Sequence, residues 1–301
     1  MRRVLCFFVV TLIAVFPIAR GDSVGFVATP SSGSGFSFTV LPFPFEPLAI
    51  NNSGQIVGSP AFIYSGGVTT TFNGQANDIN DTGVIAGVFC GTSCTSGSFL
   101  ADGTVVTPIN VPGSVGGTAF DVEGINNAGL IVGAFTTDTN GIYATHGYVE
   151  DGGIYSTLDV PGSDYTVPYK INDAGQIVGY FVDLAGTHGF LDNGGAFTTL
   201  NVPGSTRTTA LKINDHGQII GYFDDSSGEH GFLYNGGLFT TVDFPSAPNM
   251  IVSGTFLTGI NDNGQIVGVV DFTRIPEPCT LTLLVFGLLG LVGTTGTKRH
   301  R

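Results

Sequence analysis

The chain has 301 residues and a formal net charge of −13, with 46 glycines, 15 prolines and no tryptophan. Glycine or proline interrupts nearly every stretch long enough for a helix, which excludes a helical bundle and favours a turn-rich β protein. Residues 22–275 hold four basic residues against 22 acidic ones, a net charge of −18. Such a charge opposes binding of nucleic acid and is typical of an extracellular domain.

Residues 1–21 have the three parts of a secretory signal peptide. A basic start at Arg2 and Arg3 is followed by an apolar run over residues 4–18 and by a small-x-small cleavage site that ends at Gly21. We therefore expect cleavage between Gly21 and Asp22. The alternative is a first transmembrane helix, which the short run and the small residues after it disfavour.

The other end has a motif, an apolar run and a basic cluster in a fixed order. Pro276, Glu277 and Pro278 precede an uncharged run over residues 280–296, and Lys-Arg-His-Arg ends the chain. The run predicts a hydrophobic helix at the lower length limit for crossing a bilayer. The last 27 residues, IPEPCTLTLLVFGLLGLVGTTGTKRHR, resemble the PEP-CTERM sorting signal of Gram-negative bacteria.

That resemblance implies a processing partner and a location. A membrane protease of the exosortase type is expected to cut near Pro276-Glu277-Pro278 and to pass the protein outward, so residues 280–296 would occupy the inner membrane only transiently. A permanent C-terminal anchor is the alternative, which the marginal length of the run disfavours. The chain is thus expected to be exported to the cell surface or the extracellular matrix.

Between these ends, two short units alternate. A nonapeptide of the form Ile-Asn-x-x-Gly-x-Ile-x-Gly starts at Ile50, Ile79, Ile125, Ile171, Ile213 and Ile260. The second unit is clearest as HGFLDNGGAFTTLNVPGS from His188 and HGFLYNGGLFTTVDFPSA from His230, with looser copies from Ala61, Gly97 and His146. The turn residues at the centre of each unit predict a β-hairpin.

Two hairpins in about 45 residues are the content of one β-propeller blade. The chain enters with a second-type hairpin and leaves with a first-type hairpin, so residues 24–43 and 257–272 are expected to share a blade. We therefore predict an all-β domain over residues 22–274, a six-bladed β-propeller of four-stranded repeats, between the signal peptide (1–21) and the sorting segment (275–301). An open β-repeat array is the alternative. The repeats resemble the HAF family of extracellular bacterial repeats, which implies location more than activity.

Three histidines, at 146, 188 and 230, are evenly spaced and raise the question of a zinc site. Each occupies the same place in its own repeat, so we interpret them as repeat-structural residues that lie apart. The Asn-Asp-x-Gly turns contain part of a calcium-loop pattern, but Asn and Asp also stabilise turns through their own backbone contacts, and we predict that role. No metal or cofactor is expected.

Three of the four cations in the body are candidate contacts for an anion or an acidic glycan. Lys170 and Lys212 both precede the Ile-Asn turn, and Arg207 lies five residues before Lys212. Solvated charges that relieve an acidic surface are the simpler interpretation. Cys90 and Cys94 form an even pair in an oxidising compartment and predict a small disulfide loop.

No nucleophile elbow, phosphate loop or dinucleotide fingerprint is present in the sequence. We therefore expect a non-enzymatic binding or structural module. A lectin-like binder of acidic polysaccharide and an extracellular carbohydrate-active enzyme are the alternatives.

Overall fold

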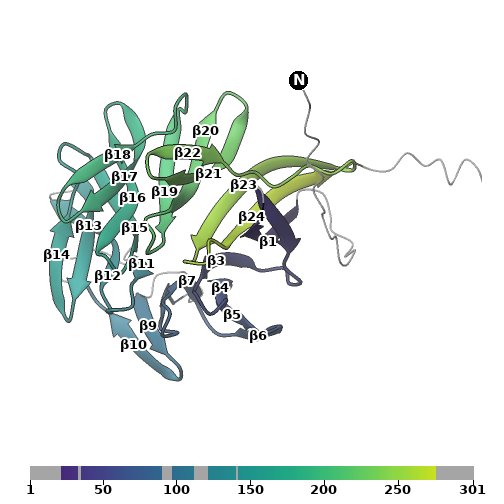
Figure 1. Cartoon of the computed structure of the whole chain (residues 1–301). Helices are drawn as coiled ribbons and strands as arrows, with labels where there is room; N and C mark the ends of the chain where they lie inside the picture. The colour runs from purple at the N-terminus through teal and green to yellow at the C-terminus, as the bar shows by residue number, and fades with distance from the viewer. Residues whose placement is uncertain (1–21, 33–34, 90–96, 112–120, 140–141, 276–301) are drawn as a thin grey trace, which may run out of the picture.

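The computed structural model describes residues 22–32, 35–89, 97–111, 121–139 and 142–275, and every regular element within them is a β-strand. The strands form two four-stranded and two eight-stranded sheets. Each eight-stranded sheet is a pair of four-stranded units joined by a single parallel bridge, Thr145 to Tyr165 in one and Glu229 to Gly254 in the other. The fold is therefore all-β, with repeated four-stranded sheets set around a common axis (Figure 1).

Within each four-stranded unit the strands are antiparallel and follow one another along the chain, except where the two ends of the domain meet. The first strands, nearest the axis, are β3 (Glu46–Ile50), β7 (Gln75–Ile79), β11 (Asp121–Ile125), β15 (Tyr165–Ile171), β19 (Arg207–Ile213) and β23 (Met250–Ile260). The second strands are β4 (Ile56–Ser59), β8 (Ile85–Val88), β12 (Ile131–Thr139), β16 (Gln176–Asp183), β20 (Ile219–Asp225) and β24 (Ile266–Arg274).

The third and fourth strands lie farther from the axis. The third strands are β5 (Phe62–Ser65), β9 (Ser98–Asp102), β13 (Ile142–Asp151), β17 (Gly186–Asn193), β21 (Gly228–Asn235) and β1 (Asp22–Pro30). The fourth strands are β6 (Val68–Thr71), β10 (Val105–Ile109), β14 (Ile154–Leu158), β18 (Phe197–Leu200), β22 (Leu238–Thr241) and β2 (Phe36–Val40). Both predicted hairpins are present in this order.

In every repeat, a glycine and an aromatic residue pair across the two middle strands. The glycine is the last residue of the nonapeptide, and the aromatic residue belongs to the second unit. Gly179 pairs with Phe190, and a Cβ on Gly179 would lie 2.8 Å from that ring and 2.1 Å from the carbonyl oxygen of Val167. The equivalent pairs are Gly58–Phe62, Gly87–Phe99, Gly133–Tyr148, Gly221–Phe232 and Gly268–Phe26. Glycine lets the aromatic ring lie close over the backbone, which explains why the repeat needs both residues.

The two ends of the domain contribute to one sheet. β1 pairs with β24 from Asp22 opposite Phe272 to Ala28 opposite Ile266, and β2 continues the sheet beyond β1. The strand order is therefore β23-β24-β1-β2. This confirms the prediction that residues 24–43 and 257–272 share a four-stranded unit.

Candidate functional site at the axis

The six nonapeptide turns converge at one end of the axis, where the first strands end. Each turn is built in the same way, as the copy at Asn172 illustrates. The backbone N–H of Gly175 donates to the carbonyl oxygen of Asn172 at 3.0 Å, and Gly175 has φ 77°, the left-handed region that favours glycine. The side-chain Oδ1 of Asn172 accepts the N–H of Gln176 at 2.9 Å. The prediction that these asparagines stabilise turns is confirmed.

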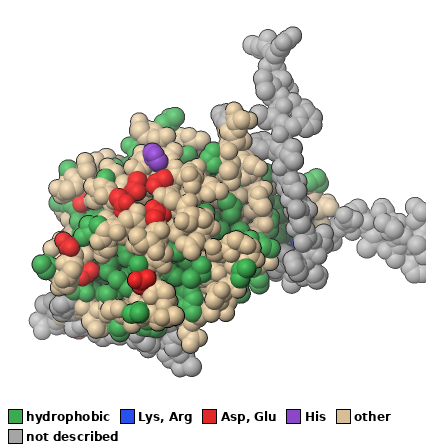
Figure 2. Space-filling view, turned by 60° about the horizontal axis from the view of Figure 1, so that its bottom comes forward, with side chains coloured by type: hydrophobic (Ala, Val, Ile, Leu, Met, Phe, Trp, Pro, Cys, Tyr) green, Lys and Arg blue, Asp and Glu red, His purple; other side chains and the backbone are tan. Residues whose placement is uncertain are grey.

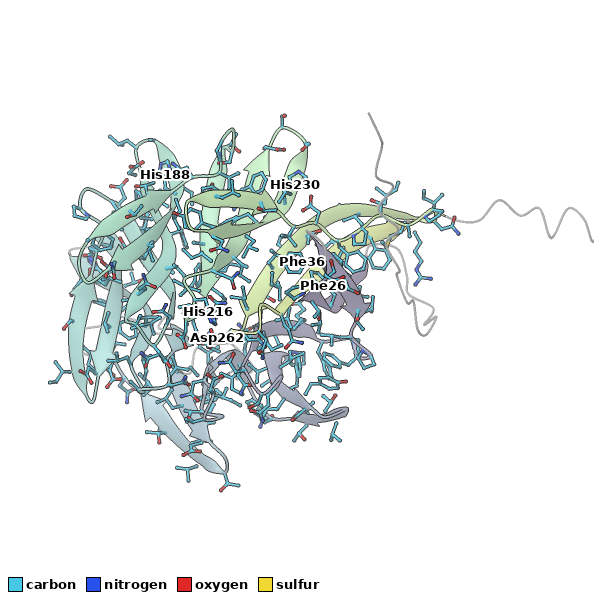
Figure 3. All side chains as sticks on the ribbon, in the orientation of Figure 1. Phe26, Phe36, His188, His216, His230 and Asp262 are labelled. Carbon is cyan, nitrogen blue, oxygen red and sulfur yellow. The ribbon has the colours of Figure 1, made fainter. Side chains whose placement is uncertain are left out.

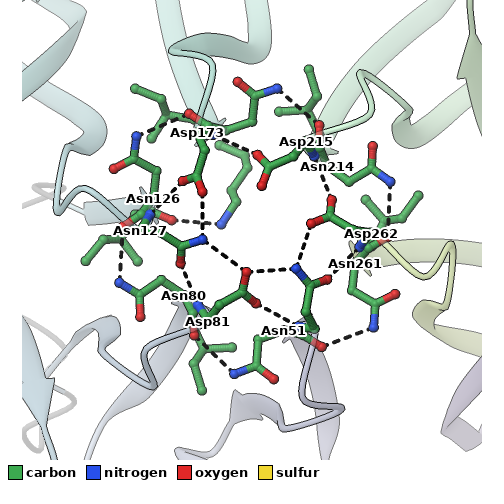
Figure 4. A pocket seen from close by; sticks show the side chains of 18 of the residues that line it. Asn51, Asn80, Asp81, Asn126, Asn127, Asp173, Asn214, Asp215, Asn261 and Asp262 are labelled. Carbon is green, nitrogen blue, oxygen red and sulfur yellow. Dashed lines mark hydrogen bonds between the residues drawn. The ribbon is translucent and has the colours of Figure 1, made fainter.

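The same asparagines also join neighbouring turns. The Nδ2 of Asn51 donates to the backbone oxygen of Asn80 at 3.1 Å, and each asparagine repeats this bond to the next turn. The bonds that follow are Asn80 to Asn126, Asn126 to Asn172, Asn172 to Asn214, Asn214 to Asn261 and Asn261 to Asn51, at 3.1–3.2 Å. All six side chains are buried. We call these six residues the asparagine ring (Figure 4).

A second ring lies one residue farther along each turn and closer to solvent. Each backbone N–H in it donates at 2.7–2.8 Å to the side-chain Oδ1 of the residue in the next turn. Its members, which we call the mouth ring, are Asn52, Asp81, Asn127, Asp173, Asp215 and Asp262 (Figure 4). Acidic side chains accordingly gather over the middle of this face (Figure 2).

The charges in the mouth ring are unevenly neutralised. The Asn52 amide donates to Asp81 and Asp262, and the Asn127 amide donates to Asp81 and Asp173. Asp215 stands between Asp173 and Asp262 with no asparagine beside it. Partial burial, with a contribution from the charges of its neighbours, raises the pKa of Asp215.

Beneath the rings lies a buried ion cluster drawn from three sheets. Asp78 of β7 is 2% exposed, and its Oδ2 lies 2.5 Å from the Nζ of Lys170 in β15. The Nζ of Lys212 in β19 lies 3.8 Å from Asp78 Oδ1 and donates to the backbone oxygens of Asn77 and Glu123. Burial lowers the pKa of Lys212, against the opposing effect of Asp78.

A β-bulge in each first strand positions this cluster. The register shifts just before the residue that precedes the turn isoleucine, as between Pro168 and Lys170 in β15. The residues at that position are Ala49, Asp78, Gly124, Lys170, Lys212 and Gly259. A bulge re-aims a side chain. Gly124 allows close packing, because a Cβ there would lie 2.8 Å from the Lys170 Cα.

Little room remains on the axis for a ligand. The cavity lined by the two rings and Lys170 has a volume of about 50 Å³, which is space for a few water molecules. Ligand pockets commonly measure about 300–1,000 Å³. Within the described residues, no group of three or more His, Cys, Asp or Glu side chains is arranged to hold a metal ion.

Two larger grooves lie between neighbouring sheets, at equivalent places in the repeat. One, of about 330 Å³, is lined by Leu100 and Ile125, and the other, of about 380 Å³, by Leu233 and Ile260. Both are on the same end of the molecule as the mouth ring, because both include residues of the nonapeptide turns. These grooves, and not the axis, have the volume that an organic ligand requires.

The structure separates the three cations that the sequence groups together. Lys170 and Lys212 meet on Asp78, but neither reaches an open face with a free charge. Arg207 lies at the other end of β19, paired with Asp224 at 2.7 Å and Glu229 at 3.1 Å. A shared anion-binding face made of all three therefore does not exist in this fold.

The three evenly spaced histidines lie in corresponding places on separate sheets. Each Nδ1 is 2.8–3.0 Å from a side-chain oxygen thirteen residues farther on, in the pairs His146–Asp159, His188–Asn201 and His230–Asp243. His188 and His230 lie far from the axis, whereas His216 lies beside Asp262 near it (Figure 3). The repeat-structural interpretation is confirmed for His146, His188 and His230.

One of these histidines belongs to a Ser-His-Asp series. Ser227 Oγ lies 2.9 Å from His230 Nε2, whose Nδ1 lies 2.8 Å from Asp243 Oδ2. However, Ser227 Oγ is also 2.6 Å from Asp225, and it lies on the exposed turn between β20 and β21. A hydroxyl has a single proton to donate, and the carboxylate is the stronger acceptor. The series therefore fixes the turn and does not activate Ser227 as a nucleophile.

Sequence reasoning missed Asp78 and Glu123. The comparison that singled out Lys170 and Lys212, the residue just before each turn, could have found Asp78 as the one acid at that position. Glu123 lies one residue earlier in its own repeat and contributes to the electrostatic environment of Lys212. Neither residue belongs to a recognisable motif.

Several predicted features lie outside the described residues. They are Gly21 of the signal cleavage site, Cys90 and Cys94, the Pro276-Glu277-Pro278 motif and the apolar run 280–296. Asp22 is the first residue of β1. In the part of the chain that the structure describes, no helix is long and apolar enough to cross a membrane.

No protein-family model matches this chain, and no curated protein matches it. Among solved structures it is similar to a putative TolB from Agrobacterium tumefaciens, with a TM-score of 0.61 and 11% identity over 86% of this chain and 100% of that one. Lower likenesses, both with a TM-score of 0.39, are to YCF48 bound to D1 peptide (8% identity, 88% and 99% covered) and to PorZ of the Porphyromonas gingivalis type-IX secretion system (10% identity, 81% and 42% covered). The first likeness supports a β-propeller fold for this chain.

Proposed function

We propose that this chain is an exported bacterial surface protein whose body is a closed six-bladed β-propeller, used as a non-enzymatic binding or structural module. Closure is supported by the pairing of β1 with β24. It is also supported by the hydrogen bond from Asn261 to Asn51, which returns the asparagine ring to its start. A closed ring of sheets removes two exposed edges that an open array would carry.

The observation that carries the non-enzymatic part is the filling of the axis by the protein's own polar groups. The asparagine amides are bonded from turn to turn, and the charges of Lys170 and Asp78 neutralise each other beneath them. A catalytic site needs space for a substrate beside its acid or base. The cavity of about 50 Å³ has no such space, and the two inter-sheet grooves, which do have it, are lined by a single acidic residue, Asp102.

A partner would therefore bind to the outer faces or between the sheets. Acidic polysaccharide is a weaker candidate than the sequence suggests, because the cations expected to contact it are already paired with Asp78, Asp224 and Glu229. The groove beside Leu233 is lined by apolar and uncharged polar side chains, which suits a neutral ligand, and the groove beside Leu100 adds one acid, Asp102.

Export and sorting rest on the two terminal signals. The proposal is that a signal peptidase cuts before Asp22 and that an exosortase-type protease cuts near Pro276-Glu277-Pro278. Mass spectrometry of the protein recovered from the cell surface tests both cuts. A mature chain that begins at Asp22 and ends close to Pro278 is expected, and an exported chain that retains Arg301 would overturn the processed tail.

The mature protein, incubated with neutral and acidic polysaccharides, tests the absence of catalysis. Retention on an immobilised glycan with no release of reducing ends is expected if the propeller is a binding module. Release of reducing ends that persists after Lys212→Met and disappears after substitution of an acidic residue outside the ion cluster would contradict the proposal and locate an active site away from the axis. Neither retention nor release would leave the structural role.

A further inference from the structure

The end of the β23–β24 pair farthest from the mouth ring combines exposed apolar side chains with a cation and carries no acid. We define the tip as residues 249–252 and 273–275, where β23 begins and β24 ends. Ile251 is 57% exposed and Ile275 is 44% exposed. Residues 244–261 carry no charged side chain, although residues 22–275 together have a net charge of −18. Arg274, one of the four cations of the body, lies between the two exposed isoleucines in the pairing.

The tip is held in a defined shape by backbone bonds. Ile251 pairs with Thr273 across the two strands, and beyond the last pair the N–H of Ile275 donates to the Asn249 oxygen at 3.0 Å. The Arg274 guanidinium lies 6.0 Å from the ring centre of the buried Phe272, and the Arg274 side chain is exposed. Asp271 is the nearest described acid in β24, and it is bonded to Ser23 of β1.

The short stretch of chain between the tip and the apolar run limits how far the tip can lie from the membrane. The apolar run that is expected to enter the membrane begins at Thr280, five residues after Ile275. Five residues span at most about 18 Å when fully extended, at roughly 3.6 Å each. The headgroup layer on each side of a bilayer is about 5–8 Å thick. An inserted tail therefore keeps the tip next to the lipid surface.

We infer that the tip is a lipid-contacting surface, with Ile251 and Ile275 in the headgroup layer and Arg274 directed to lipid phosphates while the tail is uncut. This inference rests on the proposed function, because it needs residues 280–296 to enter the membrane. β24 runs from the nonapeptide turn at Ile266 to the tip at Arg274, so the mouth ring and the inter-sheet grooves point away from the membrane. A partner would then reach the grooves from the side of the molecule that faces away from the membrane.

The absence of tryptophan allows a direct test. The full chain carrying Ile251→Trp as its single tryptophan is reconstituted into vesicles of phosphatidylethanolamine and phosphatidylglycerol, with and without brominated acyl chains. The matched control is Leu238→Trp, which is 69% exposed at the start of β22, on the end of the molecule that carries the mouth ring. We expect brominated lipid to quench the fluorescence at 251 and to leave the fluorescence at 238 unchanged.

Flotation of the vesicles separates the two levels of the proposal. If the full chain fails to float with vesicles, the membrane stage of the proposed function is wrong, and the tip is not a lipid surface either. If the chain floats but 251 is quenched no more than 238, the tail is inserted and the tip inference alone is overturned. Quenching at 251 that weakens after Arg274→Gln, and only in vesicles with phosphatidylglycerol, supports the assigned role of Arg274.

Discussion

Two layers on the axis of this protein use the repeat in opposite ways. The asparagine ring takes the same residue from six turns, and its six bonds differ by no more than 0.1 Å. The ion cluster beneath it takes Asp78, Lys170 and Lys212 from a position at which some repeats carry an acid, some a lysine and some no charge. Identical residues in neighbouring turns can hydrogen-bond to one another. A buried lysine instead needs a carboxylate, and here Asp78 comes from a repeat that is not its neighbour.

The largest effect on stability is expected from removing Asp78, the acid that Lys170 and Lys212 share. Asp78→Asn leaves Lys170 and Lys212 in a buried site from which their closest carboxylate has been lost. Breaking a buried ion pair from one side costs about 3–5 kcal/mol. We expect the free energy of unfolding, measured by urea denaturation of the mature protein, to fall by that amount.

A triple variant distinguishes lost charge balance from lost packing. Asp78→Leu combined with Lys170→Met and Lys212→Met removes all three charges at similar volume, which is often neutral or stabilising. It should recover most of the loss seen in Asp78→Asn. A triple variant as unstable as the single one would show that the shape of the site, and not its charge balance, holds the three sheets together.

Substitutions in the asparagine ring should lower the free energy of unfolding less than Asp78→Asn does, because none of them leaves a buried charge without a partner. Asn126→Ala removes the bond to the Asn172 oxygen and leaves the N–H of Leu130 without its acceptor. An unsatisfied buried group costs about 1–3 kcal/mol, and we expect a loss of about 2–4 kcal/mol in the same urea experiment.

The control for this variant lies on the same turn layer. Asn263→Ala removes a single exposed bond of 3.3 Å to the Asn52 oxygen, and its effect should stay within about 0.5 kcal/mol, the usual range for a surface substitution. Equal losses for the two variants would mean that the position of an asparagine in the ring has no special importance.

The sequence could predict the parts of these layers but not all of their contacts. The nonapeptide marks Asn126 and Asn172 as turn residues, and the period of the repeat indicates four strands and the shared sheet at the ends. It does not predict that turns 46 residues apart bond to each other, because a turn satisfies its own backbone equally well in an open array. The Lys170–Asp78 pair spans 92 residues and follows no motif. Only the bulged geometry of the first strands brings such residues together.

Within the ion cluster, the two lysines should differ in how much each contributes to stability. Lys170 is 2.5 Å from Asp78 and Lys212 is 3.8 Å away, so Lys170→Met removes the main partner and should destabilise the protein more than Lys212→Met. Burial lowers the pKa of Lys212 below 10.5, so the folded state disfavours its charged form, and this destabilisation is present below the folded pKa. It disappears as the pH rises past 10.5.

Lys212→Met should therefore lie within about 1 kcal/mol of the parent at pH 7. Relative to the parent it should become less favourable as the pH approaches 10.5, where the parent no longer carries the buried charge. Urea unfolding at pH 7 and at pH 10 measures the trend. A difference between parent and variant that does not change with pH would mean that Lys212 contributes only through its bonds to the backbone oxygens of Asn77 and Glu123.

The smallest effect is expected in the mouth ring, where charge and repetition meet. Partial burial and the charges of Asp173 and Asp262 raise the pKa of Asp215 above 3.8, so its carboxylate is disfavoured in the folded state at neutral pH. Asp215→Asn keeps the Oδ1 that accepts the Asp173 N–H and removes the charge. We expect a gain of a few tenths of a kcal/mol at pH 7, in the range of exposed charge pairs. The gain should fade as the pH falls through the raised pKa of Asp215 and be lost below 3.8, where the parent is neutral in both the folded and the unfolded state.

Asp81→Asn is the matched control, because the amides of Asn52 and Asn127 already bind that carboxylate, and there the same substitution should destabilise the fold. Opposite signs at the two positions would show that the asparagines of the mouth ring relieve repulsion between its acids, and equal signs would show that the ring responds only to its total charge.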